Sequence, residues 1–174
     1  MIQVDVRELL AHPGASRVHR LEQPVDGIRL ELAGMPEGAA VRGDLLLESV
    51  VEGILVSGPI TGPLTLTCAR CLMEFDGEFD ARIQELFVAP GREIGPDDYT
   101  VGPEGTIDLE PLVRDNVLPA LPFSPLHAPD CQGLCERCGG NRNLGECSCT
   151  DEPVDDRWAA LDALFADAPD GGSA

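Results

Sequence analysis

The feature that most constrains this chain is a group of cysteines near its C-terminal end. Five of the seven cysteines lie within residues 131–149, CQGLCERCGGNRNLGECSC. Two pairs have the spacing Cys-x-x-Cys: Cys68 with Cys71, and Cys135 with Cys138. Two intervening residues allow both sulfur atoms to reach one tetrahedral ion at about 2.3 Å. The spacing therefore predicts that bound metal holds part of the fold together.

Disulfide bonds are a weaker interpretation of the same residues. The first fourteen residues, MIQVDVRELLAHPG, lack the basic start and apolar middle of a signal peptide. No apolar run approaches the roughly 20 residues of a membrane span. We therefore expect a cytoplasmic protein without membrane contact, in a compartment that keeps thiols reduced. Seven is also an odd number, so full pairing would leave one thiol over.

Eight residues are candidate ligands, enough for two closed tetrahedral sites. They are Cys68, Cys71, His127, Cys131, Cys135, Cys138, Cys147 and Cys149. In one partition, the four cysteines of residues 135–149 form a local site and the other four ligands form a second. In the other, both Cys-x-x-Cys pairs share one ribbon-like site, and the remaining cysteines are loose or supporting. Spacing leaves both partitions open. We expect one or two structural zinc ions, because the short Cys-x-Cys step suits zinc better than an iron–sulfur cluster.

The residues after the two pairs differ. Gly139 follows the second pair and accepts the left-handed backbone that turns amides toward the sulfur atoms. Leu72 follows the first pair, so we expect that turn to be a tight hairpin at a strand end and not a free-standing knuckle.

Catalysis by the thiols is an alternative. A site with four protein ligands is closed, so it holds structure and does not activate water. The Arg of Cys68-Ala-Arg-Cys71 would lower a thiol pKa, which favours redox chemistry. However, this pair lies between strands and lacks the βαβ setting of thioredoxin-like sites. The chain has no phosphate-binding glycine loop and no Ser-His-Asp spacing, so we expect no enzyme and no small-molecule substrate.

Charge bears on the partner. The formal charge is −19, of which residues 43–174 carry −18. Such a chain repels phosphate, so a basic protein partner fits its sign better than RNA. RNA contact would need a local arginine surface in the N-terminal third and beside the ligands. The candidate residues are Arg17, Arg20, Arg29, Arg70, Arg137 and Arg142.

The patterns predict an α+β fold: an antiparallel β-rich domain with two or three short helices and a zinc-stapled cysteine-rich loop near the C-terminus. Residues 41–88 have strand patterns, with a turn expected at PITGP, residues 59–63. In LTLTC and FDGEFDARI the apolar residues alternate with polar ones, which indicates antiparallel strands with one wet face. Residues 1–14 read as a strand and a helical turn, and residues 18–32 as one or two strands around a turn at residues 24–27.

A helix is expected within IDLEPLVRDNVLPAL. Asp108 suits its N-cap, and its apolar stripe, Leu109, Leu112, Val113 and Val117, should pack on the sheet. Residues 89–106 have the composition of a long surface loop. VDDRWAALDALFADA predicts an amphipathic helix, and the last six residues are predicted disordered. We expect one domain with four segments: residues 1–40, 41–126 with the β-meander and packing helix, 127–150 with the metal loop, and 151–174.

Three stretches together resemble a known family: LTLTCARCLMEFDGEFDARIQELF, IDLEPLVRDNVLPALP and HAPDCQGLCERCGGNRNLGECSC. They are similar, in this order, to the YceD family of large ribosomal RNA subunit accumulation proteins. The tail DDRWAALDAL also resembles that family, whereas the first forty residues resemble it only loosely. The resemblance implies a bacterial or organellar protein needed for normal levels of large-subunit ribosomal RNA. It also favours grouping Cys68, Cys71 and Cys131, because some members retain these three and lack the last four cysteines.

From the resemblance we expect a non-enzymatic ribosome-biogenesis factor. It would support synthesis, processing or accumulation of 23S ribosomal RNA by binding ribosomal RNA, a large-subunit ribosomal protein, or both. The alternatives are a thiol redox or RNA-processing enzyme, and a purely structural zinc-binding interaction module.

Overall fold

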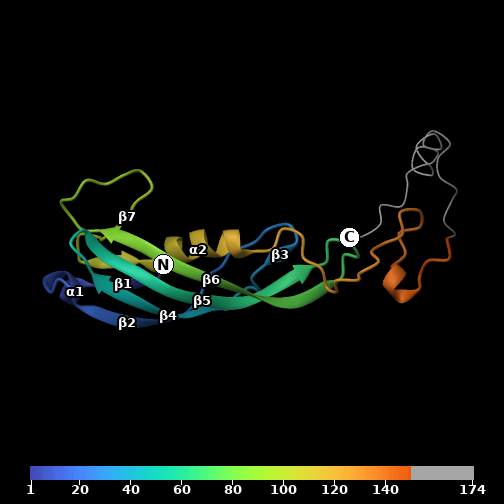
Figure 1. The fold of residues 1–174 in the computed structure, drawn as a ribbon, viewed down its shortest axis with the longest axis horizontal. Coiled ribbons are helices and arrows are strands. Elements are labelled where there is room, and N and C mark those ends of the chain that lie inside the picture. The colour runs from blue at the N-terminus through green and yellow to red at the C-terminus, as the bar shows by residue number, and fades with distance from the viewer. Residues whose placement is uncertain (150–174) are drawn as a thin grey trace, which may run out of the picture. The chain divides into compact units, whose positions relative to one another are not determined.

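The computed structural model describes residues 1–149, which form a strand-rich fold with few helices (Figure 1). The chain divides into a first unit, residues 1–133, and a second unit that begins at Leu134. The strands are β1 (Gln3–Asp5), β2 (Ser16–Pro24), β3 (Ala33–Gly34), β4 (Ala40–Ser49), β5 (Gly53–Thr67), β6 (Glu74–Val88), β7 (Tyr99–Thr100) and β8 (Thr106–Asp108). The helices are α1 (Arg7–Ala11) and α2 (Leu109–Val117), with 3-10 turns η1 (Leu118–Ala120) and η2 (Arg142–Leu144).

The main sheet has the strand order β2-β4-β5-β6-β7, with β3 paired to β5. Strands β4, β5 and β6 form the predicted meander, and β5 pairs with β6 without a break from Gly53↔Val88 to Thr67↔Glu74. Apolar side chains alternate along these strands and face one side, where α2 packs on β6. The buried residues on this inner face include Leu45, Leu47, Ile54, Val56, Ile60, Leu64, Phe79, Ile83 and Phe87. The fold class and the single wet face agree with the prediction.

The turn expected at PITGP is wrong, because β5 runs straight through these residues. A proline has no backbone N–H to donate. Within a sheet it therefore needs a position where its nitrogen faces no hydrogen-bonded neighbour strand. Pro59 lies in a gap of the β4–β5 ladder, between Ser57 and Ile60. The strands approach closely there, because a Cβ on Gly43 would lie 2.3 Å from the Pro59 carbonyl oxygen. Pro63 lies between the end of the β4 pairing and the start of the β3 pairing.

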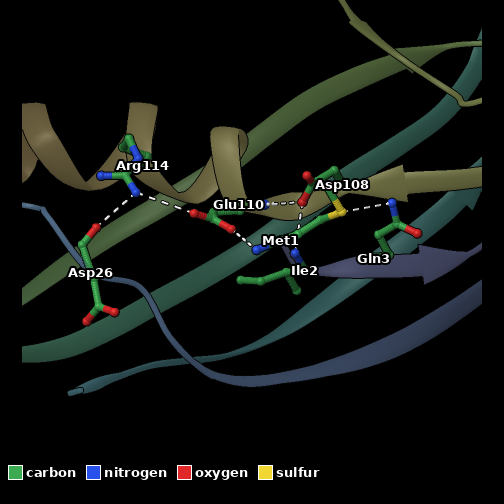
Figure 2. Close-up of polar contacts among 7 residues, drawn as sticks. All are labelled: Met1, Ile2, Gln3, Asp26, Asp108, Glu110 and Arg114. Atoms are coloured by element: carbon green, nitrogen blue, oxygen red, sulfur yellow. Dashed lines mark hydrogen bonds and ion pairs between the residues drawn. The ribbon is translucent and has the colours of Figure 1, made fainter.

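Asp108 ties α2 to the first strand. Its side chain accepts hydrogen bonds from the amide of Glu110 at 3.0 Å and from the amide of Ile2 at 2.9 Å (Figure 2). The first contact makes Asp108 the N-cap of α2, as predicted. Figure 2 also shows Glu110 between the amino group of Met1 and Arg114. The four residues of the apolar stripe of α2 are all buried.

Residues 18–32 contain one strand, within the one or two that were expected. Strand β2 ends at Pro24, and no second strand lies within residues 25–32, although Arg29 forms an isolated bridge with Gly34. The loop at residues 89–106 contains β7, which pairs in parallel with the end of β6. The predicted helix in VDDRWAALDALFADA and the predicted disordered tail lie outside the described residues. Within residues 1–149, no helix is long and apolar enough to cross a membrane.

Candidate metal centres

The first candidate centre lies at the turn that connects β5 to β6. Cys68, Cys71, His127 and Cys131 place one ligand atom each within 4.8 Å of the others. The Sγ atoms of Cys68 and Cys131 are 3.7 Å apart, and His127 Nδ1 is 3.3 Å from Cys71 Sγ and 3.4 Å from Cys68 Sγ. A tetrahedron with bonds of about 2.3 Å has edges of about 3.8 Å. These three separations are close to the edges of a tetrahedral ligand set, and all four ligand atoms are near enough to share one ion.

The two halves of this centre come from distant segments. The amide of Ala69 donates to the carbonyl oxygen of Pro125 at 2.8 Å, which draws the segment after η1 alongside the hairpin. The guanidinium of Arg70 donates to the carbonyl oxygen of Cys131 at 2.9 Å. Gly133 then lies so close that a Cβ on it would be 3.1 Å from the Arg70 carbonyl oxygen. The backbone of the first Cys-x-x-Cys turn thus holds the segment that carries His127, and the Arg70 side chain of the same turn holds Cys131.

The first Cys-x-x-Cys turn is closed by two backbone hydrogen bonds. The amide of Leu72 donates to the carbonyl oxygen of Cys68 at 2.9 Å. The amide of Cys68 donates to the carbonyl oxygen of Met73, also at 2.9 Å. Leu72 has a φ of 59°, a left-handed conformation that non-glycine residues rarely adopt. Its side chain is 59% exposed, so packing against the core does not offset the backbone strain.

The second turn repeats this arrangement in the second unit. The amide of Gly139 donates to the carbonyl oxygen of Cys135 at 2.8 Å. The amide of Cys135 donates to the carbonyl oxygen of Gly140 at 2.9 Å. Gly139 has a φ of 71°, as its position after the pair predicted. Leu72 and Gly139 therefore occupy equivalent positions in the two turns. The first turn lies in the tight hairpin between β5 and β6, as predicted, whereas no strand flanks the second turn among the described residues.

The second candidate centre consists of Cys135, Cys138, Cys147 and Cys149, whose sulfur atoms all lie within 4.8 Å of one another. A short loop with η2 returns the chain to the turn. Asn141 caps η2, its carbonyl oxygen accepts from the amide of Glu146 at 3.2 Å, and its amide donates to the Glu146 carboxylate at 3.1 Å. This buried asparagine closes the loop that brings Cys147 and Cys149 back.

Each centre favours one thiolate and disfavours its neighbours. Burial opposes the thiolate of Cys68, but hydrogen bonds from His127 and from backbone amides lower its pKa to about 5. Burial and the neighbouring thiols raise the pKa of Cys71. In the second centre, the amides of Cys138 and Arg137 lower the pKa of Cys135 to about 6. Hydrogen bonds with Cys138 and Cys147 raise the pKa of Cys149 to about 12. Crowded sulfur atoms cannot all ionise without a cation among them, so both sets suit a divalent ion.

The structure thus gathers all eight candidate ligands, and it groups them as in the first of the two partitions. The six candidate arginines come from several separate segments of the two units. Arg17 and Arg20 lie on β2, and Arg17 donates to the Asp5 carbonyl oxygen at 2.6 Å. Arg29 lies in the loop before β3. Arg137 and Arg142 belong to the second unit.

The contact of Arg70 with the Cys131 backbone was not predicted from the sequence, where Arg70 is a candidate for RNA contact. The shared pattern Cys-x-Arg-Cys in both pairs, CARC and CERC, is the signal that could have indicated two equivalent turns.

Comparison with known proteins gives a family and several relatives. The family described as "Large ribosomal RNA subunit accumulation protein YceD" matches residues 56–165. An uncharacterized protein of Mycobacterium tuberculosis is 38% identical over 172 residues, which covers 91% of this chain and 78% of the relative. An uncharacterized protein of Mycobacterium leprae is 36% identical over 173 residues, which covers 95% of this chain and 78% of the relative. No solved structure matches the chain significantly.

Proposed function

The chain belongs to the YceD family, and on that premise we propose that it is a non-enzymatic ribosome-biogenesis factor of the bacterial cytoplasm. It supports the accumulation of 23S ribosomal RNA by binding a large-subunit ribosomal protein, ribosomal RNA, or both. The family match carries this proposal, because residues 56–165 contain both Cys-x-x-Cys turns, most of the β5–β6 hairpin and α2.

A basic ribosomal protein is the favoured direct partner. Residues 43–174 carry seven Arg against 25 acidic residues, so the field around this part of the chain repels phosphate. The arginines on the outer face of the sheet are also interleaved with acids: Arg42 pairs with Glu22 at 3.1 Å, and Arg20 lies opposite Asp44. Such a mixed surface gives little of the sustained positive field that RNA binding needs.

Zinc is the proposed cofactor, with one ion in each centre. The donor sets, three Cys with His and four Cys, are those of structural zinc sites. Four protein ligands leave no position for water or substrate, which supports a role in holding the hairpin end and the cysteine-rich loop. The whole described chain is proposed to act as one YceD-like domain.

The function is tested by deleting the gene in a bacterium that carries it and comparing 23S with 16S ribosomal RNA. We expect the 23S level and the yield of large subunits to fall, and both to recover with the wild-type gene. Complementation with Cys71→Ser should fail if the first centre is needed for the fold. An unchanged ratio of 23S to 16S RNA in the deletion strain would refute the ribosomal role.

The choice between partners has its own test. Purified zinc-loaded protein is titrated with a large-subunit RNA fragment and, separately, with basic large-subunit ribosomal proteins. If RNA is contacted, its affinity should fall steeply between about 50 and 200 mM salt and fall further in Arg20→Ala with Arg29→Ala. RNA binding without salt dependence would count against these arginines, and binding of ribosomal proteins alone would support the favoured partner.

A further inference from the structure

Strand β6 presents a long open edge. On one side it pairs with β5 along its whole length of 15 residues. On the other side, β7 is its only strand partner among residues 1–149, and β7 meets Phe87 and Val88 at the end of the strand. Among residues 1–149, no backbone hydrogen bond joins another segment to this side of β6 between Glu74 and Leu86. An edge of this length is a template for an additional strand.

The direction of the open groups follows from two hydrogen bonds at the end of β6. The amide of Val101 donates to the Val88 carbonyl oxygen at 3.0 Å from the β7 side, and the amide of Ala89 donates to Glu52 at 2.9 Å on the β5 side. Backbone groups alternate in direction along a strand. The N–H and C=O groups of the even-numbered residues from Glu74 to Leu86 therefore face the open edge.

The same residues carry most of the charge of the strand. Four successive even positions hold exposed carboxylates on the outer face. Glu85 is also exposed but has an odd position, opposite Val56, and Arg82 is the only base in β6. The acidic residues are Glu74, Asp76, Glu78, Asp80 and Glu85. Carboxylates on an edge prevent two copies from pairing edge to edge, and they attract a strand of the opposite charge.

We infer that the open edge of β6 binds an extended, Arg- or Lys-rich segment of a partner protein, which adds to the sheet as a further strand. Main-chain hydrogen bonds to the even-numbered residues would supply affinity, and the carboxylates would select basic side chains. The proposal deepens the proposed function and rests on it for the source of the segment: a basic large-subunit ribosomal protein.

Other occupants fit the edge less well. Residues 150–174 of this chain carry seven acidic residues against Arg157, so the β6 carboxylates repel them. A second β6 would bring carboxylates opposite carboxylates. RNA brings phosphates into an acidic field and offers no strand backbone.

The test uses zinc-loaded protein and a dye-labelled peptide of alternating Arg and Val. Two matched peptides are the controls: one alternates Glu and Val, and one is the basic peptide with alternate amides N-methylated. We expect the basic peptide alone to bind. Binding should slow hydrogen exchange at the amides of Asp76, Glu78 and Asp80, while the odd-numbered amides already paired with β5 change little.

Two variants separate backbone pairing from charge. Gln84→Pro removes one edge-facing amide at constant charge, and a proline is tolerated at an edge position. We expect it to weaken binding about tenfold, the effect of about 1.4 kcal/mol. Glu78→Gln should weaken binding and reduce its salt dependence, whereas Asp44→Asn on the interior strand β4 should do neither.

Several results would overturn the inference. These are equal binding of the N-methylated peptide, unchanged affinity in Gln84→Pro with native zinc content, slowed exchange on β2 instead of β6, and self-association of the free protein through β6. The proposed function can be judged apart from this result, because the effect of gene deletion on 23S RNA does not depend on which surface binds the partner.

Discussion

The guanidinium of Arg70 donates a hydrogen bond of 2.9 Å to the backbone carbonyl oxygen of Cys131, 61 residues further along the chain. Arg70 is the third residue of the first Cys-x-x-Cys turn, so one side chain joins the hairpin half of the first centre to its later half. A charged donor that fixes the backbone of a ligand is the kind of contact that holds a metal site in geometry.

Arg70→Ala is expected to lower the zinc affinity of the first centre about tenfold or more, because it releases the Cys131 backbone. The affinity is measured by competition with a chelator, with the exposed Arg82→Ala as the control. Arg70→Lys keeps the charge but not the planar donor group, so it should also lose affinity. Wild-type zinc affinity in both Arg70 variants would show that the contact contributes nothing to the centre.

Metal content tests the grouping of the ligands. Wild-type protein is expected to hold two zinc ions per chain, and Cys71→Ser and Cys138→Ser should each hold about one. The reason is that each change removes a ligand from only one of the two sets. Total loss of metal in either variant would mean that both Cys-x-x-Cys pairs share a single site. Elemental analysis after exhaustive dialysis gives the number.

Exchanging the residues at the equivalent turn positions should have opposite effects. Leu72→Gly is expected to raise the free energy of unfolding by about 0.5–1 kcal/mol, because glycine adopts the left-handed backbone without strain. Gly139→Ala is expected to destabilise the metal-loaded second centre by about 1 kcal/mol. A Cβ at Gly139 meets nothing within 4 Å, so backbone strain alone acts there.

Urea unfolding of zinc-loaded protein measures the effect of Leu72→Gly. Chelator competition measures the effect of Gly139→Ala on the second centre. Zinc content should stay at the wild-type level in both variants at saturating zinc. A loss of stability in Leu72→Gly would show that the exposed leucine side chain contributes more than its backbone strain costs.

The local signals in the sequence were sufficient for much of this structure. The Asp108 cap and the apolar stripe define α2, because both depend on residues within a few positions of one another. The alternation in β5 and β6 defines the inner face for the same reason. The spacing of the cysteines predicted which residues are the candidate ligands. Spacing alone did not predict how the ligands divide between two centres.

The features that were missed depend on distant partners. Pro59 and Pro63 led to the prediction of a turn. A local pattern cannot show that continuous pairing with β6 keeps β5 extended through both prolines. The two-residue strand β7 exists only through its pairing with the end of β6. Leu72 gave no local sign of a left-handed conformation, which accompanies the backbone hydrogen bonds that close the turn from Cys68 to Met73.

Zinc binding at pH 7 is expected to release protons. Without metal, burial raises the pKa of Cys71 and neighbouring thiols raise the pKa of Cys149 to about 12, so both are protonated at pH 7. Zinc binds the thiolates, so its stabilisation is present at high pH and lost as the pH falls. The last thiolates to accept protons are Cys135 and Cys68, whose pKa values are about 6 and about 5. Calorimetric titration in two buffers of different ionisation enthalpy should give different heats, and equal heats would contradict the protonated thiols.

Asp108→Ala is expected to lower the free energy of unfolding by about 1–2 kcal/mol, because two backbone amides lose one acceptor. The Asp108 side chain caps α2 through Glu110 and holds Ile2 at the start of β1, so its loss affects both elements. Asp108→Asn keeps the accepting oxygen and should cost much less, since Asn is an equally good N-cap. Urea unfolding of the zinc-loaded variants measures the difference, with Asp98→Ala in the exposed loop as the control. Similar losses for the Ala and Asn variants would mean that the charge of Asp108, and not its role as an acceptor, supports the helix.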